Sequence, residues 1–442
     1  MSAADSAADP VVIAGMAVEA PGGIDSLPGY WTALAESRDL TGPFPRNRAW
    51  PIDRLLSLSQ VEGWSQVSDA GGFLDGAGEF DPMFFGITPR EAVAMDPQQR
   101  VAMRVAWRAL ENAGINPAML DGDDGGCYMG VSYTEYGPRG AEVNEYSGYR
   151  ATGSASGAVS GRISHCLGLV GPTISVDTAC ASSLTAVHLA ASAIRAGDCE
   201  WALAGAVCVL GSPAGFFEFS KANALSADGQ CRPYSDDANG TLWGEGAGVV
   251  VLERESRARR MGHRVYGRIL GTQVNHNGKG APIAVPSTAA QERLIRKTVA
   301  AAGIEPALIK MIEGHGTGTA VGDPIELAAL QHIYGAAVHP TGDGPLLGSV
   351  KSNLGHAQAA AGLLGLIKVL LSGLHGHIPP TRFADNPSRK VDWDSSSVRL
   401  AEKLEYWAPR DGVRYGAVSS FGVAGTNAHA IVSMPVLEDI HV

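Results

Sequence analysis

Cysteine is scarce in this chain, and its spacing matches no metal or redox motif. The 442 residues include six cysteines, at positions 127, 166, 180, 199, 208 and 231. None belongs to a CxxC pair of the kind that zinc clusters and thioredoxin-like sites use, so we expect no metal site. Free thiols in a chain of this size are typical of a reducing compartment, which predicts a cytoplasmic protein.

Long stretches of positive charge are absent as well. The chain carries 34 Lys and Arg residues against 45 Asp and Glu, a formal net charge of −11. Without a basic block we expect no nucleic-acid partner. One basic cluster follows a predicted strand, and its members are Arg254, Arg257, Arg259, Arg260 and Arg264. A solvated loop is the favoured interpretation, and a docking patch for an acidic carrier protein is the alternative.

Targeting and membrane segments are also missing from the pattern. The first ten residues are acidic and lack the apolar core of a signal peptide. The most apolar stretch, residues 359–374, is interrupted by Lys368, and we expect it to be too short to span a bilayer. No low-complexity linker divides the chain. With 45% hydrophobic and 18% charged residues, the composition is that of a globular protein with a large core.

The sequence does contain five short β-branched runs that alternate with helical runs rich in small residues. They lie at residues 11–16, 172–177, 248–253, 309–314 and 428–433. This alternation predicts α/β layers with the strands buried between helices. One helix start is especially clear, because Asp96 as N-cap, Pro97 at the first position and Gln99 at the third form a predicted capping arrangement.

Two distant segments share one plan. Residues 171–197 and 344–373 each open with Gly-Pro, run through a predicted strand, turn, and enter a helix of small and aliphatic residues. The first turn carries Cys180 and the second carries His356. Chance similarity between two strand–turn–helix units is one explanation. A genuine duplication is the other, and it predicts two related halves that meet at a shared site.

Cys180 lies at the predicted turn from strand to helix, within DTACASS (177–183). Backbone N–H groups and the helix dipole favour negative charge at such a turn, which predicts a lowered thiol pKa and a resting thiolate. The small neighbouring residues leave room for an acyl thioester. A buried, inert cysteine is the other interpretation, and the local sequence does not separate the two.

Two histidines stand in glycine-rich turns. His315 lies between Gly314 and Gly316, where a side chain fills a core poorly but can meet a substrate that approaches the backbone. His356 follows Gly355 at another predicted helix entry. A third turn punctuated by glycine, residues 419–427, is suited to presenting a backbone N–H group to an oxyanion.

These groups meet the needs of one chemistry. Carbon–carbon bond formation from a thioester requires a thiolate to hold the acyl group. It also requires a carbanion, most simply released by loss of CO₂ from a malonyl-type thioester, and N–H donors for the enolate oxygen. Cys180, the pair His315 and His356, and the turn at 419–427 supply these three requirements.

The motifs together resemble those of β-ketoacyl synthases of the thiolase superfamily, in the branch found in type I polyketide synthases. The resemblance runs from about Val11 to Val432. It rests on GGFLDGAGEFDPMFFGITPREAVAMDPQQR (71–100), DTACASSL (177–184), EGHGTGTAVGDPIE (313–326), KSNLGHAQAAAG (351–362) and SSFGVAGTNAH (419–429).

The resemblance implies a thiolase-like, five-layered α/β/α/β/α fold built from two duplicated halves and working as a homodimer. The nucleophile Cys lies in the N-terminal half, here residues 11–262, and the two His in the C-terminal half, residues 263–434. Residues 1–10 are then a flexible N-terminus and residues 435–442 a tail.

The resemblance also implies roles for the residues of the motifs. Cys180 is the acylated nucleophile, and His315 and His356 serve decarboxylation and stabilise the enolate. Lys351 and Glu326 match the supporting charged pair of the family.

The remaining matches concern the substrate. Thr317 and Thr319 match the threonines that bind phosphopantetheine, and the backbone N–H groups of Cys180 and Val423 match the oxyanion hole. Val423 stands where fatty-acid relatives commonly carry a gating Phe, which implies a more open acyl pocket. The family binds no cofactor of its own, because its substrates arrive on the phosphopantetheine of a carrier protein.

The implied activity is a decarboxylative Claisen condensation in polyketide or mixed peptide–polyketide biosynthesis. With no carrier or acyltransferase pattern in the chain, we expect an acyl carrier protein and an acyltransferase in trans. The chain most resembles stand-alone ketosynthases of mycobactin- and nocobactin-type siderophore assembly lines. The alternatives are a domain excised from a larger modular polyketide synthase and a non-condensing partner subunit, although such subunits lack the cysteine. A thiolase is disfavoured because no cysteine follows Cys231.

Overall fold

The structure is a computed structural model that describes residues 9–137, 147–279, 282–337 and 344–436. The flexible N-terminus expected at residues 1–10 and the tail expected at 435–442 therefore lie almost entirely outside the described residues. The other predicted elements can be compared with the structure directly.

Ten strands form two sets of five with the same order and directions. The first set comprises β1 (Val11–Glu19), β2 (Gly125–Gly130), β3 (Thr173–Val176), β4 (Trp201–Cys208) and β5 (Gly246–Arg254), and the second comprises β6 (Gly267–His276), β7 (Met311–Glu313), β8 (Leu346–Gly348), β12 (Val413–Phe421) and β13 (Thr426–Pro435). The orders are β3-β2-β4-β5-β1 and β8-β7-β12-β13-β6. In each set the first two pairings are parallel and the last two are antiparallel.

The two sets join where β1 pairs with β6, at Val12–Arg268 and Ile13–Gly267. A short strand, β10 (Arg399–Leu400), extends the second set beyond β8, and β9 (His377–Ile378) pairs with β11 (Glu405–Tyr406) separately. Since both sets repeat one topology, the predicted duplication of the fold is confirmed. The exact division at residues 262 and 263 stays a prediction.

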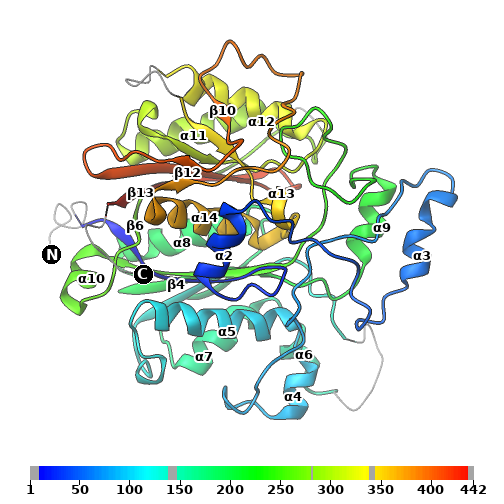
Figure 1. The fold of residues 1–442 in the computed structure, drawn as a ribbon. Helices are drawn as coiled ribbons and strands as arrows, with labels where there is room; N and C mark the ends of the chain where they lie inside the picture. The colour runs from blue at the N-terminus through cyan, green and yellow to red at the C-terminus, as the bar shows by residue number, and fades with distance from the viewer. Residues whose placement is uncertain (1–8, 138–146, 280–281, 338–343, 437–442) are drawn as a thin grey trace.

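Helices lie in three layers around the strands (Figure 1). The helices α5 (Pro97–Asn112) and α7 (Gly157–Leu167) cover the outer face of the first set, and α11 (Thr288–Ala302) and α12 (Gly322–Leu330) lie beyond the second. Between the sets lie α8 (Ser182–Ala196) and α14 (Ala361–His375). This order of layers confirms the expected α/β/α/β/α fold.

The other helices fill the connections. They are α2 (Leu27–Ala35), α3 (Ile52–Leu56), α4 (Pro89–Ala94), α6 (Arg150–Gly153), α9 (Ala214–Lys221), α10 (Glu255–Met261) and α13 (Lys351–Leu354), with 3-10 turns at Leu58–Gln60, Pro117–Met119, Pro306–Leu308 and Gln358–Ala360 and a π-helical turn at Gln331–Gly335.

The layers explain where the apolar side chains go. Neighbouring residues of a strand point to opposite faces, so Val249 of β5 packs in the outer cluster with α5, whereas Val250 packs in the middle cluster with α8 and α14. A third cluster fills the space under α11 and α12. A strand that is buried on both faces therefore appears in the sequence as a continuous apolar run.

The most apolar helix belongs to the middle layer. By length and composition the segment Gln358–His375 could cross a membrane, so the expectation that it is too short was wrong. However, 89% of this segment is buried inside the protein, because α14 has a strand set on either side. Lys368 lies within it and forms an ion pair of 2.7 Å with the equally buried Glu313. The segment is a core helix of the fold.

The two segments with one sequence plan occupy equivalent places. β3 leads through a turn to α8, and β8 leads through α13 to α14. The two long helices pack directly on each other, and the Leu363 N–H donates to Ser183 Oγ at 3.0 Å. Gly362 allows this approach, since a Cβ there would lie 2.8 Å from Leu184 Cγ. The middle layer thus joins the two halves.

Two local predictions need correction. The Asp96 side chain caps α5 as expected, accepting from the Gln98 N–H at 2.9 Å, but Gln99 does not complete the arrangement. Asp96 already donates its own N–H to the Gly153 carbonyl, and Gln99 Nε2 also donates there, at 2.9 Å. The second correction concerns β3, which is half-buried to exposed because it forms the free edge of the first strand set.

The basic cluster is helical instead of a loop. α10 follows β5 directly and carries three of the five arginines. Arg257 forms an ion pair with Glu253, Arg259 pairs with Glu255, and the Arg264 guanidinium lies 4.7 Å from the Tyr266 ring centroid. Ion pairs thus offset the charge of Arg257 and Arg259. Its role as a docking patch stays a prediction.

Candidate active site

Cys180 lies in a strained turn between β3 and α8. Ala179, the residue before it, has a φ of +53°, a conformation that is uncommon outside glycine. The Asp177 carboxylate stabilises the turn by accepting from the Ala179 N–H at 2.8 Å. From the other half of the protein, Ser420 Oγ donates to the Cys180 carbonyl at 2.6 Å. The position of the thiol is therefore set by both halves.

The charge state of Cys180 differs from the prediction. Burial raises the pKa of its thiol to about 11, although Lys351 and the backbone N–H groups of Val423 and Cys180 itself lower it. Desolvation disfavours the charged form of a buried thiol, and here it outweighs the helix end and the nearby cation. The expected resting thiolate is therefore wrong, and the thiol is protonated at neutral pH.

His315 and His356 lie beside each other, brought from two different loops. Their ring centroids are 5.4 Å apart and the rings are nearly perpendicular, at 82°. His356 Nδ1 accepts the Gln358 N–H at 3.1 Å, which places the proton of the neutral ring on Nε2. Burial and the charge of Lys351 hold the pKa of both imidazoles well below the usual value. Both rings are thus neutral at pH 7, and His356 presents an N–H donor.

The loop that carries His315 is held by a buried carboxylate. Glu326 of α12 accepts the His315 N–H at 2.6 Å and the Gly316 N–H at 2.8 Å. It also accepts the Tyr234 hydroxyl at 2.9 Å. Ser349 Oγ donates to the Gly316 carbonyl at 3.0 Å from the direction of β8. These contacts fix the backbone on which the imidazole stands.

Thr317 and Thr319 continue the same loop. Their hydroxyls are 3.2 Å apart, and both side chains are partly exposed. The Asp323 carboxylate accepts three backbone N–H groups of this loop, at 3.1 to 3.3 Å, including those of both threonines. The two hydroxyls therefore stand side by side on a rigid turn, in a position to bind a polar ligand.

The turn between β12 and β13 completes the site. The Phe421 ring lies 5.4 Å from the His315 ring, and the Val423 N–H faces the Cys180 sulfur. The Val423 side chain is 45% exposed. Two N–H groups thus converge on the thiol, and no bulky side chain stands at position 423.

Two family models match this chain in sequence. The β-ketoacyl synthase N-terminal domain matches residues 8–258, and the β-ketoacyl synthase C-terminal domain matches residues 266–384. The chain belongs to the β-ketoacyl synthase family. Its class is that of the acyltransferases that form carbon–carbon bonds, which confirms the fold and family predicted from the motifs.

Curated relatives of this synthase are much longer proteins. The chain is 44% identical over 98% of its length to mycoketide-CoA synthase of Mycobacterium tuberculosis, of which it spans 10%. It is 47% identical over 98% of its length to the spectinabilin polyketide synthase system protein NorB of Streptomyces orinoci, of which it spans 20%. To erythronolide synthase EryA3 of Saccharopolyspora erythraea it is 45% identical, over 96% of the chain and 13% of that protein.

Solved structures of ketosynthases match the synthase closely. The oxazolomycin ketosynthase domain OzmH KS7 of Streptomyces albus superposes with a TM-score of 0.90 at 37% identity, over 98% of this chain and 77% of that one. The ketosynthase from module 6 of the bacillaene synthase of Bacillus subtilis gives a TM-score of 0.88 at 36% identity, over 97% and 73%.

The supporting charges of the synthase are arranged differently from the matched pair. No ion pair joins Lys351 to Glu326, whose oxygens are taken up by the His315 loop and Tyr234. Glu313 is the stronger counter-charge of Lys351, and Glu326 is the weaker one. Glu313 also accepts the Val350 N–H at 2.6 Å, so it links the strand before His315 to the segment before His356.

Glu313, Asp323 and Tyr234 are the site residues that the motifs did not single out. Glu313 and Asp323 are buried carboxylates within EGHGTGTAVGDPIE. Their position beside glycine or proline in this motif is the sequence feature that could have identified them. Tyr234 comes from a loop about 80 residues earlier, and no local pattern connects it to His315. Only the folded chain shows these contacts.

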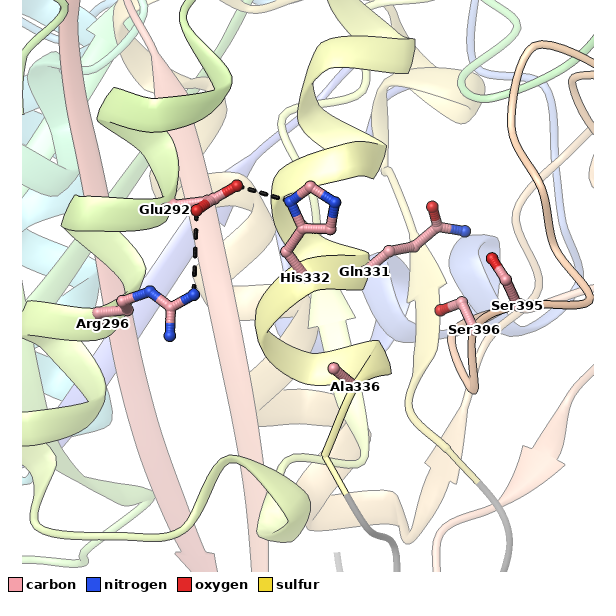
Figure 2. Close-up of a pocket in the computed structure, with 7 residues that line it drawn as sticks. All are labelled: Glu292, Arg296, Gln331, His332, Ala336, Ser395 and Ser396. Carbon is pink, nitrogen blue, oxygen red and sulfur yellow. Dashed lines mark hydrogen bonds and ion pairs between the residues drawn. The ribbon is translucent and has the colours of Figure 1, made fainter.

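The hollow in Figure 2 lies away from this constellation. It measures about 400 Å³ and is lined by Glu292, Arg296, Gln331, His332, Ala336, Ser395 and Ser396. Glu292 bonds to His332 at 2.6 Å and lies 3.9 Å from Arg296, so these three side chains of the hollow interact with one another. Among the described residues no cluster of three His, Cys, Asp or Glu side chains could hold a metal ion.

Proposed function

We propose that this chain condenses an acyl group held on Cys180 with a malonyl-type carrier thioester. The observation that carries the proposal is that two neutral imidazoles lie side by side, that the His315 ring contacts Phe421, and that the Val423 N–H of the same turn faces the Cys180 thiol. Its mechanism has two half-reactions.

In the first half-reaction the acyl group moves from a carrier thioester to Cys180. The thiol gives up its proton to a neutral imidazole of the His pair, the proposed base, and its sulfur attacks the acyl carbonyl. The oxyanion that forms accepts the N–H groups of Cys180 and Val423. The carrier thiolate then leaves and takes a proton, so an S–C bond forms on the enzyme as one breaks on the carrier.

In the second half-reaction a malonyl-type thioester loses CO₂. The enolate oxygen accepts the His356 Nε2–H, and His315 supplies the second imidazole. The carbanion attacks the acyl carbonyl, and the tetrahedral intermediate again uses the two backbone N–H groups. Cys180 leaves as a thiolate and recovers a proton. The product is a β-ketoacyl group on the carrier.

Partners follow from this chemistry. Thr317 and Thr319, with adjacent hydroxyls, are proposed to bind the phosphopantetheine arm of an acyl carrier protein, and both this carrier and an acyltransferase are proposed to act in trans. A homodimer is proposed through the free edge of β3, where Ile174 is 42% exposed, because such an edge invites pairing with another strand. Cytoplasmic location remains a prediction.

Uptake of an acyl group, measured by intact mass, tests the nucleophile. Wild type incubated with an acyl-pantetheine thioester should gain one acyl group, and Cys180→Ala should gain none. Cys127→Ala is the control, since Cys127 is another buried thiol and lies on β2. Uptake by Cys180→Ala at wild-type stoichiometry would refute the assignment.

The biosynthetic context is proposed more narrowly. The chain spans a fifth or less of the curated relatives named above, one of which is a polyketide synthase system protein by its name. This supports a polyketide or mixed peptide–polyketide product and keeps open a domain of a larger synthase. A mycobactin-type siderophore product remains the more specific proposal, and neighbouring peptide-synthetase and salicylate-activating genes would support it. A non-condensing partner subunit is disfavoured because Cys180, His315 and His356 are all present and assembled.

A further inference from the structure

The turn that carries Val423 is held on its outer side by the end of β6. His276 Nε2 lies 2.9 Å from the carbonyl oxygen of Ala424, the residue after Val423. The Asn277 N–H donates to the Gly425 carbonyl, also at 2.9 Å. Two consecutive residues of the β6 end therefore bind two consecutive carbonyls of this turn.

The imidazole of His276 is fixed at both ring nitrogens. The Gly278 N–H donates to Nδ1 at 2.9 Å. A ring nitrogen that accepts a hydrogen bond carries no proton, so in the neutral ring the proton lies on Nε2. Nε2–H is therefore a donor to the Ala424 carbonyl, and the ring bridges two backbone groups.

Gly425, in this turn, leaves the space that the His276 ring occupies. Gly425 has a φ of +93°, and a Cβ at this position would lie 2.7 Å from His276 Nε2. The Asn427 side chain adds a second tie, donating to Asn277 Oδ1 at 2.8 Å. The β6 end and the turn pack as one unit, with no room for a side chain between them.

On its inner side the same turn presses against the nucleophile. A Cβ on Gly422 would lie 2.4 Å from the Thr178 carbonyl, and the Val423 N–H faces the Cys180 sulfur. The turn is thus held between the Cys180 loop and His276. A change at His276 reaches the thiol only through the backbone of the turn.

We propose that His276 is a positioning residue that aims the Val423 N–H at the oxyanion of acyl-Cys180. The proposal rests on the proposed function, because this oxyanion exists only if Cys180 is acylated. His276 touches no reacting atom and acts through the Ala424 carbonyl. It serves the steps in which an acyl carbonyl is attacked, and it has no part in the loss of CO₂, which the His315 and His356 pair serves.

Three variants test this role. His276→Ala should slow both acylation of Cys180 and condensation roughly 3- to 10-fold, the effect expected from one lost hydrogen bond. His276→Gln should recover most of the rate, since its amide can donate to Ala424 and accept from Gly278. His332→Ala is the matched control, because His332 is also an exposed histidine, but its imidazole bonds to Glu292 and not to the Val423 turn. Decarboxylation of a malonyl-pantetheine thioester should be unchanged in all three.

Alkylation of Cys180 by iodoacetamide at a fixed pH gives a readout that needs no condensation. The Val423 N–H lowers the pKa of the thiol, so a displaced N–H should slow alkylation in His276→Ala and leave His332→Ala at the wild-type rate.

Three results would overturn the role of His276. These are wild-type acylation in His276→Ala, equal losses in the Ala and Gln variants, and a parallel loss of decarboxylation. Failure of the wild type to acylate would instead overturn the proposed function, and alkylation would then still show whether His276 holds the Val423 N–H against the thiol.

Discussion

Ser420 Oγ donates a hydrogen bond of 2.6 Å to the carbonyl oxygen of Cys180, although 240 residues separate them in the chain. Ser420 lies on β12 of the second strand set, and Cys180 follows β3 of the first. Ser420 is completely buried and Cys180 nearly so. The turn that carries Cys180, the proposed nucleophile, is therefore positioned by a side chain from the opposite half.

Replacing Ser420 by Ala should lower both stability and acylation. The variant leaves a buried carbonyl without this donor, which costs about 1–3 kcal/mol. Urea unfolding should show that loss, and acylation of Cys180 should slow. Ser372→Ala is the control, since Ser372 is an equally buried serine that donates only to the Lys368 carbonyl within α14. If acylation slows equally in the control, Ser420 has no special relation to the nucleophile.

Breaking the buried ion pair of Glu313 and Lys368 should lower the free energy of unfolding more than breaking an exposed ion pair does. Glu313→Gln and Lys368→Met each leave one buried charge without its partner, which costs about 3–5 kcal/mol. The double variant should recover only part of this loss, because neither charge of the pair then remains alone but Lys351 still lacks its stronger counter-charge, Glu313. Free energies of unfolding from urea titration measure the cycle.

A surface pair provides the comparison for this cycle. Glu36→Gln removes the partner of Arg38 in an exposed ion pair and should change stability by about 0–1 kcal/mol. Equal effects at the buried and exposed pairs would contradict the structure.

Decarboxylation should keep its full rate well below pH 6.5. Burial and Lys351 hold the pKa of His315 and His356 well below 6.5, so both rings stay neutral donors as the pH falls through that value. Activity should fall only at a lower pH, where the rings gain protons. Lys351→Met removes a charge that lowers both pKa values and should move this acid limb to higher pH. A wild-type limb centred at or above pH 6.5 would count against the neutral pair.

The same shifts affect stability in the acid range. The His pKa values are lower in the folded chain than in the unfolded one, so the unfolded state binds protons first as the pH falls. The stability associated with the neutral rings is present above the unfolded value and is lost below it. Unfolding free energies between neutral and mildly acidic pH should therefore decline.

Two glycine substitutions should have different effects, one on the rate of acylation and the other on stability. Gly422→Ala places a Cβ 2.4 Å from the Thr178 carbonyl, next to the nucleophile, so it should displace the turn and slow acylation at least tenfold. Gly161→Ala lies in α7 with open space around it and should stabilise the protein by up to about 1 kcal/mol. Thermal unfolding together with acylation rates measures both. Normal acylation by Gly422→Ala would mean that the turn can move away from Thr178 without affecting Cys180.

Much of the fold could be predicted because its information is local. Each strand buried on two faces appears as an apolar run, and the Asp96 cap stands directly before its helix. The internal repeat was visible because the strand and helix after each Gly-Pro are short-range patterns. Gln99 was predicted wrongly for the complementary reason, because its partners, the Thr152 and Gly153 carbonyls, lie more than 50 residues away.

Sequence alone determined which side chains are the candidates for the chemistry, since a thiol between small residues and two histidines beside glycines are properties of short motifs. Tertiary structure decided how those groups are charged and held. Burial makes Cys180 a protonated thiol and both imidazoles neutral, because desolvation depends on what the whole fold places around a group. Glu313 as the stronger counter-charge of Lys351, Ser420 on the Cys180 carbonyl and His276 on the Val423 turn are all contacts between distant segments. Only the packing of the two halves creates them.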